Sequence, residues 1–436
     1  IMQERLAKMK LESFAGDFSL IEFDDHDEQL DFNKKNANAN IDVDKVIIKC
    51  QSHLITPRKV HKGYLNLTKE AIIFDSDSKF INLNLSKVKK ILLRRYLMDD
   101  TAVEFFSTFS RVYFVNFQNE EERLQFLNKV ASLKVPSIKY IQRKNEDVKK
   151  MAQKVTEKWQ KGELSNFKYL MKLNIIAGRS FNDLSQYPVF PWILNDYKSD
   201  TIDLSDPSVY RDLSVPIAAH GEQRLKWMRE KMDQSVSDET RYLFGAFYSS
   251  SAVVIGYLIR MEPFTSLHIQ LQSGRFDITD RLFVSIPSSW DSVTSAQMDF
   301  RELIPEFFLI PDFLTNVNQF DLGKNVNGEV IGDVKLPPWS SSPREFIEIN
   351  KRALESPYVS ENLHRWIDII FGPHSRMPLS DEANNVFHPY FYEDSLEKAK
   401  LKANDETEMT IKLIKEYAAC FGICPLQIFD KFPEQK

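Results

Sequence analysis

The sequence has few cysteines and no long apolar run. Three cysteines occur in 436 residues, and only Cys420 and Cys424 lie close together. This number and spacing do not suit a disulfide framework, so we expect free thiols, the last two buried in a terminal helix, and a reducing compartment. An apolar run near the middle of the chain, 252–259, covers about eight residues including a glycine. A membrane-spanning helix needs roughly 20, so this run predicts a buried segment.

A basic excess and the common catalytic motifs are also absent. The net charge is −5 at pH 7 and the pI is about 6.0, so no overall positive field favours a nucleic acid or an anionic membrane. The sequence contains no GxGxxG, P-loop, HExxH or GxSxG motif, and no two histidines lie at metal-ligand spacing on one predicted helix. We therefore expect no catalytic residue, no cofactor, no metal site and no nucleic-acid partner.

The chain is long and rich in aromatic residues. Aromatic residues make up 12% of it and include 32 Phe. Its length suits two or three domains. Residues 1–45 are acidic and then Asn-rich, which is typical of a flexible arm. Residues 46–135 alternate like short strands and end in a helix after 119, with Leu124, Leu127 and Val130 on one face. The chain begins with Ile rather than Met, so we expect a piece of a longer protein.

The second half of the chain differs in its predicted secondary structure. Residues 136–160 are charged and predict a linker, and 161–436 predicts a mostly helical domain. The helices expected there cover 166–177, 221–233, 243–261, 343–355, 359–371 and 407–421.

Between these helices lie apolar stretches with no regular period, such as LMKLNIIAGRSFNDLSQYPVFPWIL (170–194). Pro188 and Pro191 exclude a helix and a central strand there, yet the neighbouring aromatic residues are too apolar for a free loop. We therefore expect an extended segment inside the domain whose backbone is hydrogen-bonded by polar side chains rather than by a sheet. The same pattern recurs over 302–323. The polar side chains of the first stretch are Asn174, Arg179, Asn182, Asp183 and Gln186; a catalytic role for them is the less favoured alternative.

Three isolated groups could carry chemistry. His364 precedes Asp368 by one helical turn, Glu262 lies before a proline, and Asp277 lies near Asp280. Structural roles are favoured for all of them: a helix histidine, a carboxylate paired with an arginine or the backbone, and a turn or ion-pair network. An enzyme that uses Glu262, Asp277 or His364 is a less favoured hypothesis.

One basic cluster, KVKKILLRR (87–95), stands out. Apolar residues interrupt its charges, so we favour a surface that docks onto an acidic neighbouring domain. The alternative is a peripheral membrane-binding module that recognises anionic lipids through this stretch.

A long series of motifs resembles the BEACH (Beige/Chediak–Higashi) family, which includes neurobeachin. SNFKYLMKLNIIAGRSFNDLSQYPVFPW opens the series, and the resemblance covers about 165–430. The stretch KVKKILLRRYLMDDTAVEFFS (87–107) resembles the divergent pleckstrin-homology (PH) domain that precedes BEACH domains. The further motifs are YRDLSVPIAA (210–219), YSSSAVVIGYLIRMEPF (248–264), LQSGRFDITDRLFVSI (271–286), ELIPEFFLIPDFLTNVNQFDLG (302–323), DVKLPPWS (333–340) and RALESPYVSENLHRWIDIIFG (352–372).

The resemblance implies an α+β fold. A PH-like β-barrel capped by a C-terminal helix would pack on a mostly α BEACH domain with a core of irregular extended segments. The groove between the domains, or a partner's groove, is expected at Arg94, Arg95, Tyr96, Glu104 and Glu262. The structural signature of the family is expected at Asn174, Arg179, Asn182, Asp183, Tyr187, Pro191 and Trp192.

The resemblance also implies a function. It indicates a non-enzymatic scaffold of a large cytoplasmic protein, peripherally associated with endomembranes, that acts in vesicle trafficking, membrane protein sorting and lysosome-related organelle dynamics. Expected partners are trafficking proteins still to be identified and a WD-repeat propeller downstream, with weak or no phosphoinositide binding. The loops at 243–250, 373–380 and 387–408 depart from the family pattern, so this chain's partner is expected to differ. The Asn-rich arm hints at a fungal source.

Overall fold

The structure is a computed structural model that describes residues 43–108, 111–144, 147–237, 240–402, 407–433 and 435–436. The arm predicted over 1–45 lies outside the described residues, except for a 3₁₀ turn at Val43–Lys45. The chain divides into two compact units, Ile1–Asp147 and Val148–Lys436, and each is described by itself.

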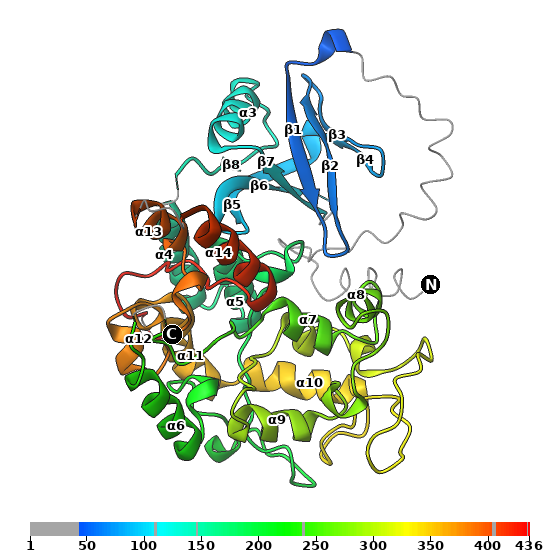
Figure 1. The fold of residues 1–436 in the computed structure, drawn as a ribbon, viewed down its shortest axis with the longest axis vertical. Helices are drawn as coiled ribbons and strands as arrows, with labels where there is room; N and C mark the ends of the chain where they lie inside the picture. Colours follow the sequence, from blue (N-terminus) through cyan, green and yellow to red (C-terminus); the bar gives the residue numbers. More distant parts are fainter. Residues whose placement is uncertain (1–42, 109–110, 145–146, 238–239, 403–406, 434) are drawn as a thin grey trace. The chain divides into compact units, whose positions relative to one another are not determined.

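The first unit contains a sheet in which most neighbouring strands also follow one another in the sequence (Figure 1). The pairs are antiparallel, except that β8 runs parallel to β5. In the described residues the strand order is β4-β3-β2-β1-β7-β6-β5-β8. The strands are β1 (Ile48–Ile55), β2 (Val60–Leu67), β3 (Ala71–Asp75), β4 (Phe80–Asn84), β5 (Val88–Tyr96), β6 (Asp99–Ser107), β7 (Val112–Phe117) and β8 (Tyr140–Ile141).

The sheet is open, whereas the sequence led us to expect a barrel. Strands β4 and β8 form its two edges in the described part of the chain. The reason lies on β5: its outer edge pairs with β8, through Lys90 to Tyr140 and Ile91 to Ile141, and so does not pair with β4. The PH-like sheet region is therefore present, but its sheet stays open instead of closing into the expected barrel.

Helix α3 (Glu120–Ser132) packs on this sheet, as predicted. The side chain of Asn119 caps its first turn by accepting a hydrogen bond from the backbone of Glu122. The buried stripe is Arg123, Phe126, Leu127 and Val130, and the last three join the core of the sheet. Leu124, expected on the buried face, is 38% exposed, because Arg123 and Phe126 occupy the inward positions of that turn.

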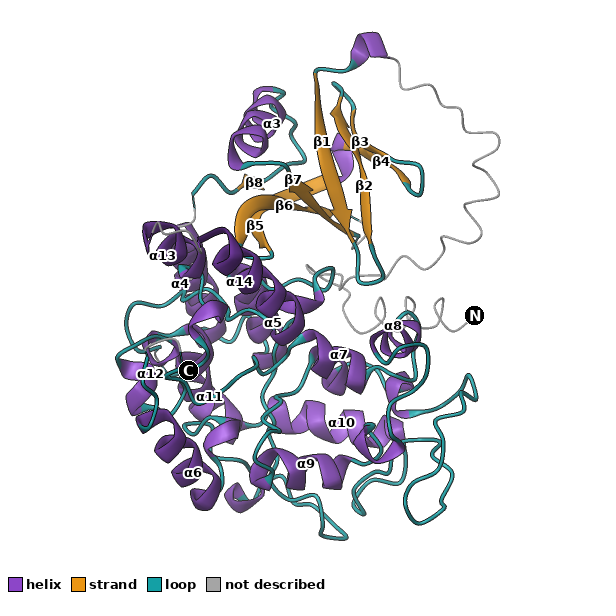
Figure 2. Cartoon of the chain, viewed as in Figure 1, coloured by secondary structure: helices purple, strands orange, loops and turns teal. Residues whose placement is uncertain are grey.

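The second unit is mostly helical, and the helices alternate with long irregular segments (Figure 2). Its helices are α4 (Asp147–Gln160, whose first residue belongs to the first unit), α5 (Asn166–Ile176), α6 (Glu222–Asp233), α7 (Ser251–Tyr257), α8 (Phe264–Leu271), α9 (Ile286–Ser295), α10 (Pro343–Leu354), α11 (Pro357–Phe371), α12 (Leu379–Glu382), α13 (Ser395–Lys402) and α14 (Thr407–Phe421).

Two segments differ from their predicted structure. The expected linker, 136–160, contains α4, whose inward face is narrow: only Val148, Ala152 and Trp159 are buried along it. The many lysines of the outward face obscure the helical spacing of these three buried residues in the sequence. The domain boundaries themselves stay a prediction. The helix expected over 243–261 is helical only at α7, because residues 243–250 are extended or turn-like and their backbone bonds to distant segments instead.

The irregular segments form the centre of the second unit. Phe190 and Leu303 exchange backbone hydrogen bonds of 2.8 and 2.9 Å, which ties the stretch around 170–194 to the one at 302–323. Phe307 packs against Trp192, Tyr257 and Phe313, with ring centroids 4.8–6.2 Å apart. Aromatic packing therefore fills the core where no sheet or helix pair does.

A helix that crosses a membrane needs a long apolar run. In the described ranges of the chain, no helix is both long enough and apolar enough to cross a membrane.

Candidate functional site

The side chain of Asn174 acts as a strand partner for an extended segment. It lies in the last turn of α5, fully buried. Its Nδ2 donates to the carbonyl oxygens of Val189 and Leu170, each at 3.0 Å, and its Oδ1 accepts from the backbone N–H of Val189 at 2.8 Å. One amide thus pairs both backbone groups of Val189, between two prolines that exclude a regular sheet there.

Arg179 holds three separate segments together. Its Nε donates to the carbonyl of Tyr187 and its Nη2 to the hydroxyl of Ser249, both at 2.8 Å, while Nη1 donates to the carbonyl of Ile423. The guanidinium also lies 4.6 Å over the ring of Phe247. Burial lowers the pKa of Arg179 to about 9, so it remains charged at neutral pH.

The remaining signature residues shape the turn that follows. Asp183 accepts from the backbone N–H and hydroxyl of Ser185 at 3.0 and 2.7 Å, and from the amide of Gln186 at 2.8 Å. Burial raises the pKa of Asp183, and these hydrogen bonds oppose that rise. The Tyr187 hydroxyl donates to Glu306 at 2.8 Å, and the backbone N–H of Asn182 donates to Ser180. Asp183 and Asn182 therefore shape their own turn, whereas Tyr187 ties it to the distant segment of Glu306.

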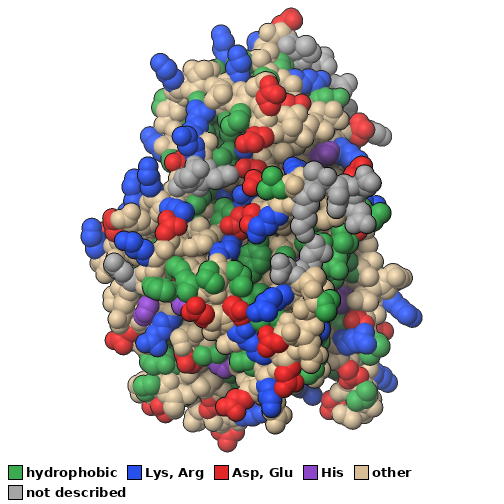
Figure 3. Space-filling model, turned by 60° about the vertical axis from the view of Figure 1, so that its left-hand side comes forward, with side chains coloured by type: hydrophobic (Ala, Val, Ile, Leu, Met, Phe, Trp, Pro, Cys, Tyr) green, Lys and Arg blue, Asp and Glu red, His purple; other side chains and the backbone are tan. Residues whose placement is uncertain are grey.

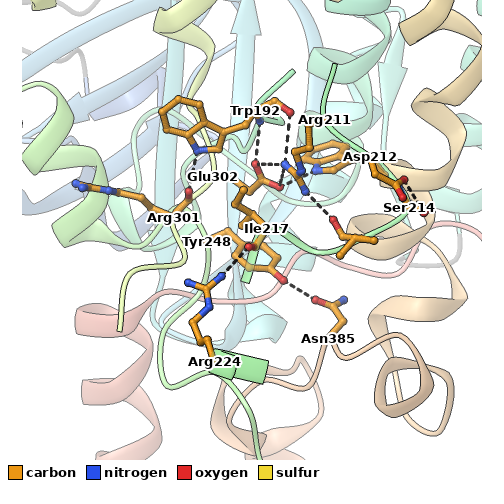
Figure 4. A network of polar contacts seen from close by, with 12 residues as sticks. Trp192, Arg211, Asp212, Ser214, Ile217, Arg224, Tyr248, Arg301, Glu302 and Asn385 are labelled. Carbon is orange, nitrogen blue, oxygen red and sulfur yellow. Dashed lines mark hydrogen bonds and ion pairs between the residues drawn. The ribbon is translucent and has the colours of Figure 1, made fainter. Parts of the chain in front are cut away.

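A second polar centre forms around Glu302 (Figure 4). Its two carboxylate oxygens lie 2.9 Å from Nη1 of Arg211, and both side chains are at most 1% exposed. The same carboxylate accepts from the backbone N–H of Trp192 at 2.9 Å and from the indole of Trp366 at 3.0 Å. The residue after Pro191 therefore obtains its backbone partner from a side chain 110 positions away.

Neighbouring groups extend this centre (Figure 4). Arg224 donates to the carbonyl oxygens of Ile217, His220, Ala296 and Asp299, each at 2.9 Å. The Tyr248 hydroxyl donates to the Oδ1 of Asn385 at 2.8 Å. Since backbone carbonyls take most of these donors, the network can stabilise irregular chain, but it presents no arrangement of nucleophile and base.

Sequence reasoning did not single out Arg211, Arg224 or Asn385. A signal existed for Arg211, because it is the one basic residue of the largely apolar motif at 210–219. A buried cation of this kind requires an anion or several carbonyl groups. Its partner Glu302 lies 91 positions away, so the pair itself could not be read from either motif.

The residues expected at a groove have partners within their own units. On the sheet, Nε of Arg94 donates to Glu104 at 2.7 Å between β5 and β6, and both side chains are buried. Tyr96 packs edge-on against Phe114 at 6.3 Å, and Arg95 is half-buried. In the second unit, Glu262 accepts from the hydroxyl and backbone N–H of Ser266 in the first turn of α8. The structure brings Arg94 and Glu104 together; the groove itself stays a prediction.

The basic stretch 87–95 is largely part of strand β5. Its residues Ile91, Leu92, Leu93 and Arg94 are buried. Burial and then the charge of Arg94 lower the pKa of Lys90. Lys87 and Lys89 are exposed, Lys90 and Arg95 are partly exposed, and Arg94 is buried. Strand formation therefore removes only Arg94 from the surface.

Two of the isolated catalytic candidates, Glu262 and Asp277, have structural partners. A carboxylate oxygen of Asp368 lies 2.5 Å from Nδ1 of His374, whereas the helical spacing suggested His364 as its partner. Burial lowers the pKa of His364. Asp277 accepts from the backbone of Ile278 and lies 3.8 Å from Arg281. Among the described residues, no group of three or more His, Cys, Asp or Glu side chains could hold a metal ion.

The cysteines differ in exposure. Cys50 and Cys424 are buried, and burial raises their pKa to about 11 and 12. Cys420, expected to be buried, is exposed on α14, and Cys424 lies beyond the end of that helix.

Comparison with known proteins places these features in a family. A family model described as Beige/BEACH domain matches residues 157–436, and one described as PH domain associated with Beige/BEACH matches 52–131. The BEACH domain-containing protein lvsE of Dictyostelium discoideum is 38% identical over 441 aligned residues, which cover 91% of this chain and 20% of that protein.

Two further relatives come from a plant and a human. BEACH domain-containing protein B of Arabidopsis thaliana is 41% identical across 80% of this chain and 14% of its own length. The WD repeat- and FYVE domain-containing protein 4 of Homo sapiens is 41% identical across 79% of this chain and 11% of its own length. The chain thus spans a fifth or less of these relatives. From the two matching domains and these relatives we conclude that the chain belongs to the BEACH family, with a BEACH-associated PH domain ahead of its BEACH domain.

Proposed function

We propose that this chain is a non-enzymatic, protein-binding scaffold module of a large BEACH protein that acts in vesicle trafficking, membrane protein sorting and lysosome-related organelle dynamics. Family membership supports the trafficking role. The observation that carries the non-enzymatic part is the use of buried polar side chains: Asn174 and Arg179 of the signature, and Glu302, bond to the backbone of irregular segments. A substrate would compete with the hydrogen bonds that hold the fold.

The loops that depart from the family pattern are the proposed contact region for a partner. The loop 373–380 exposes Met377, which is 54% exposed, and the ring of His374 packs 5.2 Å from Phe432, which is 58% exposed. Exposed apolar side chains next to charged ones are typical of protein-binding surfaces. Hydrophobic side chains also gather in groups among charged ones on the face drawn in Figure 3.

The test is affinity capture from cells with three forms of the chain. We expect the unaltered chain to capture trafficking proteins, and the double variant Met377→Glu with Phe432→Glu to lose them. Val326→Glu is the matched control, since Val326 is 84% exposed on a different loop. Equal capture by all three forms would reject this surface, and capture of no trafficking protein by the unaltered chain would reject the proposed role.

Membrane binding through 87–95 is the competing hypothesis, and no contact in the structure favours it. It requires that Lys87 and Lys89, the exposed cations, attract anionic lipid headgroups, which contributes about 1 kcal/mol for each lysine. Flotation with phosphatidylserine vesicles at low and high salt tests it. Strong, salt-sensitive flotation that Lys87→Glu with Lys89→Glu abolishes would replace the scaffold proposal.

The expected contact between the PH and BEACH domains also stays a prediction. Arg95→Glu is the informative variant, because Arg95 is half-buried, and a change at Arg94 would break its buried pair with Glu104. If the contact exists, this variant should speed limited proteolysis between 136 and 160, and Lys89→Glu should not. Unchanged protection in both variants would remove Arg95 from the interface.

A further inference from the structure

The two edges of the sheet in the first unit differ. The edge of β5 is covered by β8, which pairs with it at Lys90 and Ile91. In the described part of the chain, β4 (Phe80–Asn84) pairs with β3 alone, and no strand lies on its other side. Figure 1 shows β4 at the end of the sheet away from β5 and β8. An unpaired edge presents a row of backbone N–H and C=O groups, so β4 can accept a further strand.

The turn between β3 and β4 shows which backbone groups of β4 point outward. The N–H of Ser76 donates to the carbonyl of Lys79 at 3.0 Å. Along an antiparallel ladder, hydrogen-bonded pairs alternate with pairs that are not hydrogen-bonded. The continuous register of β3 and β4 therefore directs the backbone of Ile81 toward β3. The N–H and C=O groups of Phe80 and Asn82 point away from β3, toward the open edge.

Strand β4 lacks the features that usually protect an edge. Natural edge strands carry lysine, proline, an inward charge or a bulge that prevents pairing with another chain. The sequence of β4, FINLN, contains no charged residue, proline or glycine, and its register with β3 has no shift. Phe80 is 37% exposed, and Asn82 and Asn84 are exposed as well. The edge is therefore accessible and unprotected, which favours a pairing role.

The side chains beside the edge determine which segment fits. Ile81 is half-buried and packs on the core of the sheet, so an apolar residue opposite it extends that core. On the other face, Tyr64, Asp75 and Phe80 lie in one row across three strands, and the two rings are 45% and 37% exposed. A residue opposite Phe80 joins this mixed row and can be aromatic or polar. The fitting segment is therefore extended, with apolar residues at alternate positions.

We propose that the open edge of β4 binds an extended segment of a partner protein, which pairs with the backbone of Phe80 and Asn82 and carries apolar side chains at alternate positions. A second copy of this chain fits less well, because β4 has five residues and supplies only part of the about 800 Å² per partner that a stable dimer buries. This surface is separate from the loop 373–380, so neither proposal depends on the other.

A displayed library of short random peptides, selected on the full chain, provides the probe. We expect the selected peptides to carry apolar residues at alternate positions. They should slow hydrogen exchange at the N–H groups of Phe80 and Asn82, whereas the N–H of Ile81 is protected with and without peptide.

Two variants at one position separate backbone pairing from side-chain contact. Asn82→Pro removes an outward donor but no hydrogen bond to β3, so it should weaken peptide binding by about tenfold or more. Asn82→Ala is the matched control, because it keeps the backbone N–H and should bind as the unaltered chain does. Unchanged protection of Ile81 in Asn82→Pro shows that the hairpin is intact.

Three results would overturn the proposal. The first is a selection that yields no binder, or binders that leave the exchange of Phe80 and Asn82 unchanged. The second is equal affinity for Asn82→Pro and Asn82→Ala. The third is a dimer of the unaltered chain, seen by light scattering, that Asn82→Pro dissociates, since the edge would then belong to a second copy. The exchange pattern of the unaltered chain decides even where Asn82→Pro loosens the hairpin.

Discussion

The two units of this chain satisfy their buried backbone in different ways. In the sheet of residues 48–141, neighbouring strands pair with one another, and the ladders supply most of the backbone hydrogen bonds. In the second unit, long segments near the core have few backbone partners, and Asn174, Arg179 and Glu302 supply the hydrogen bonds. The stability of the second unit therefore depends on single side chains to a degree that the sheet does not.

The described residues of each unit include a buried arginine–glutamate pair, which makes the comparison direct. Arg94 and Glu104 connect β5 and β6, strands that the ladder already joins. Arg211 and Glu302 connect segments 91 positions apart, and their carboxylate also holds the backbone of Trp192. Breaking a buried pair leaves an uncompensated charge in both units, and in the second the loss of Glu302 also frees the backbone donor of Trp192.

The largest effect should follow the loss of the carboxylate at the centre of the second unit. We expect Glu302→Ala to reduce the free energy of unfolding by about 3–5 kcal/mol, and Glu104→Ala to cost clearly less. Tryptophan fluorescence in urea follows the second unit alone, because all six tryptophans lie between 159 and 366. Hydrogen exchange measured peptide by peptide follows the sheet. Equal losses in the two units would contradict the comparison.

Arg179→Ala should come next, with a loss of about 3 kcal/mol, because it leaves the Tyr187 and Ile423 carbonyls and the Ser249 hydroxyl short of a donor. Arg179→Lys keeps the charge but not the planar fork of donors, so it should recover less than half of the loss. Urea denaturation followed by tryptophan fluorescence measures both. A fully stable Arg179→Ala protein that has lost only a binding partner would show that the residue belongs to a recognition site.

Two buried asparagines give a finer comparison. Asn174→Leu removes both partners of the Val189 backbone and should cost about 2 kcal/mol. Asn66→Leu on β2 removes two long contacts of 3.4 Å to the carbonyls of Tyr64 and Ile73, and should cost below about 1 kcal/mol. Thermal melting with unit-specific probes checks both. A larger loss at Asn66 would mean that the ladder does not protect its strands as argued.

The smallest effect should depend on pH. Burial, and then the charge of Arg211, lower the pKa of His220 from 6.5 to about 4. The unfolded chain therefore binds a proton near pH 6.5 that the folded chain refuses until about pH 4, so the second unit loses stability as the pH falls between these values. Because His220 is partly exposed, we expect about 1–2 kcal/mol.

The His220→Asn variant isolates this contribution, since other groups titrate in the same range. As the pH is lowered from 6.5 to 4, the unfolding free energy of the unaltered chain should fall more than that of the variant. Parallel pH profiles would show that His220 takes no part.

The sequence predicted the helices with strong periods and clear caps, such as α10, whose start at Ser342 and Pro343 lies where the pattern placed it. It also predicted buried irregular chain around Pro188 and Pro191, because proline excludes the alternatives. It failed at α4 and Leu124, where lysines and an arginine obscured which face turns inward. Burial of the long arginine side chain Arg123, paired with Asp100, is a tertiary event.

By itself, then, the sequence determined the class of each region and the type of residue that the irregular core would need. Proline, apolar and polar residues have local consequences that hold in any fold. Only the tertiary structure decided the partners: that Glu302 pairs with Arg211, that Arg179 reaches the carbonyl of Ile423, and that Asp368 takes His374 rather than His364. Such pairs depend on which distant segments meet in the folded chain, and a local sequence pattern does not carry that information.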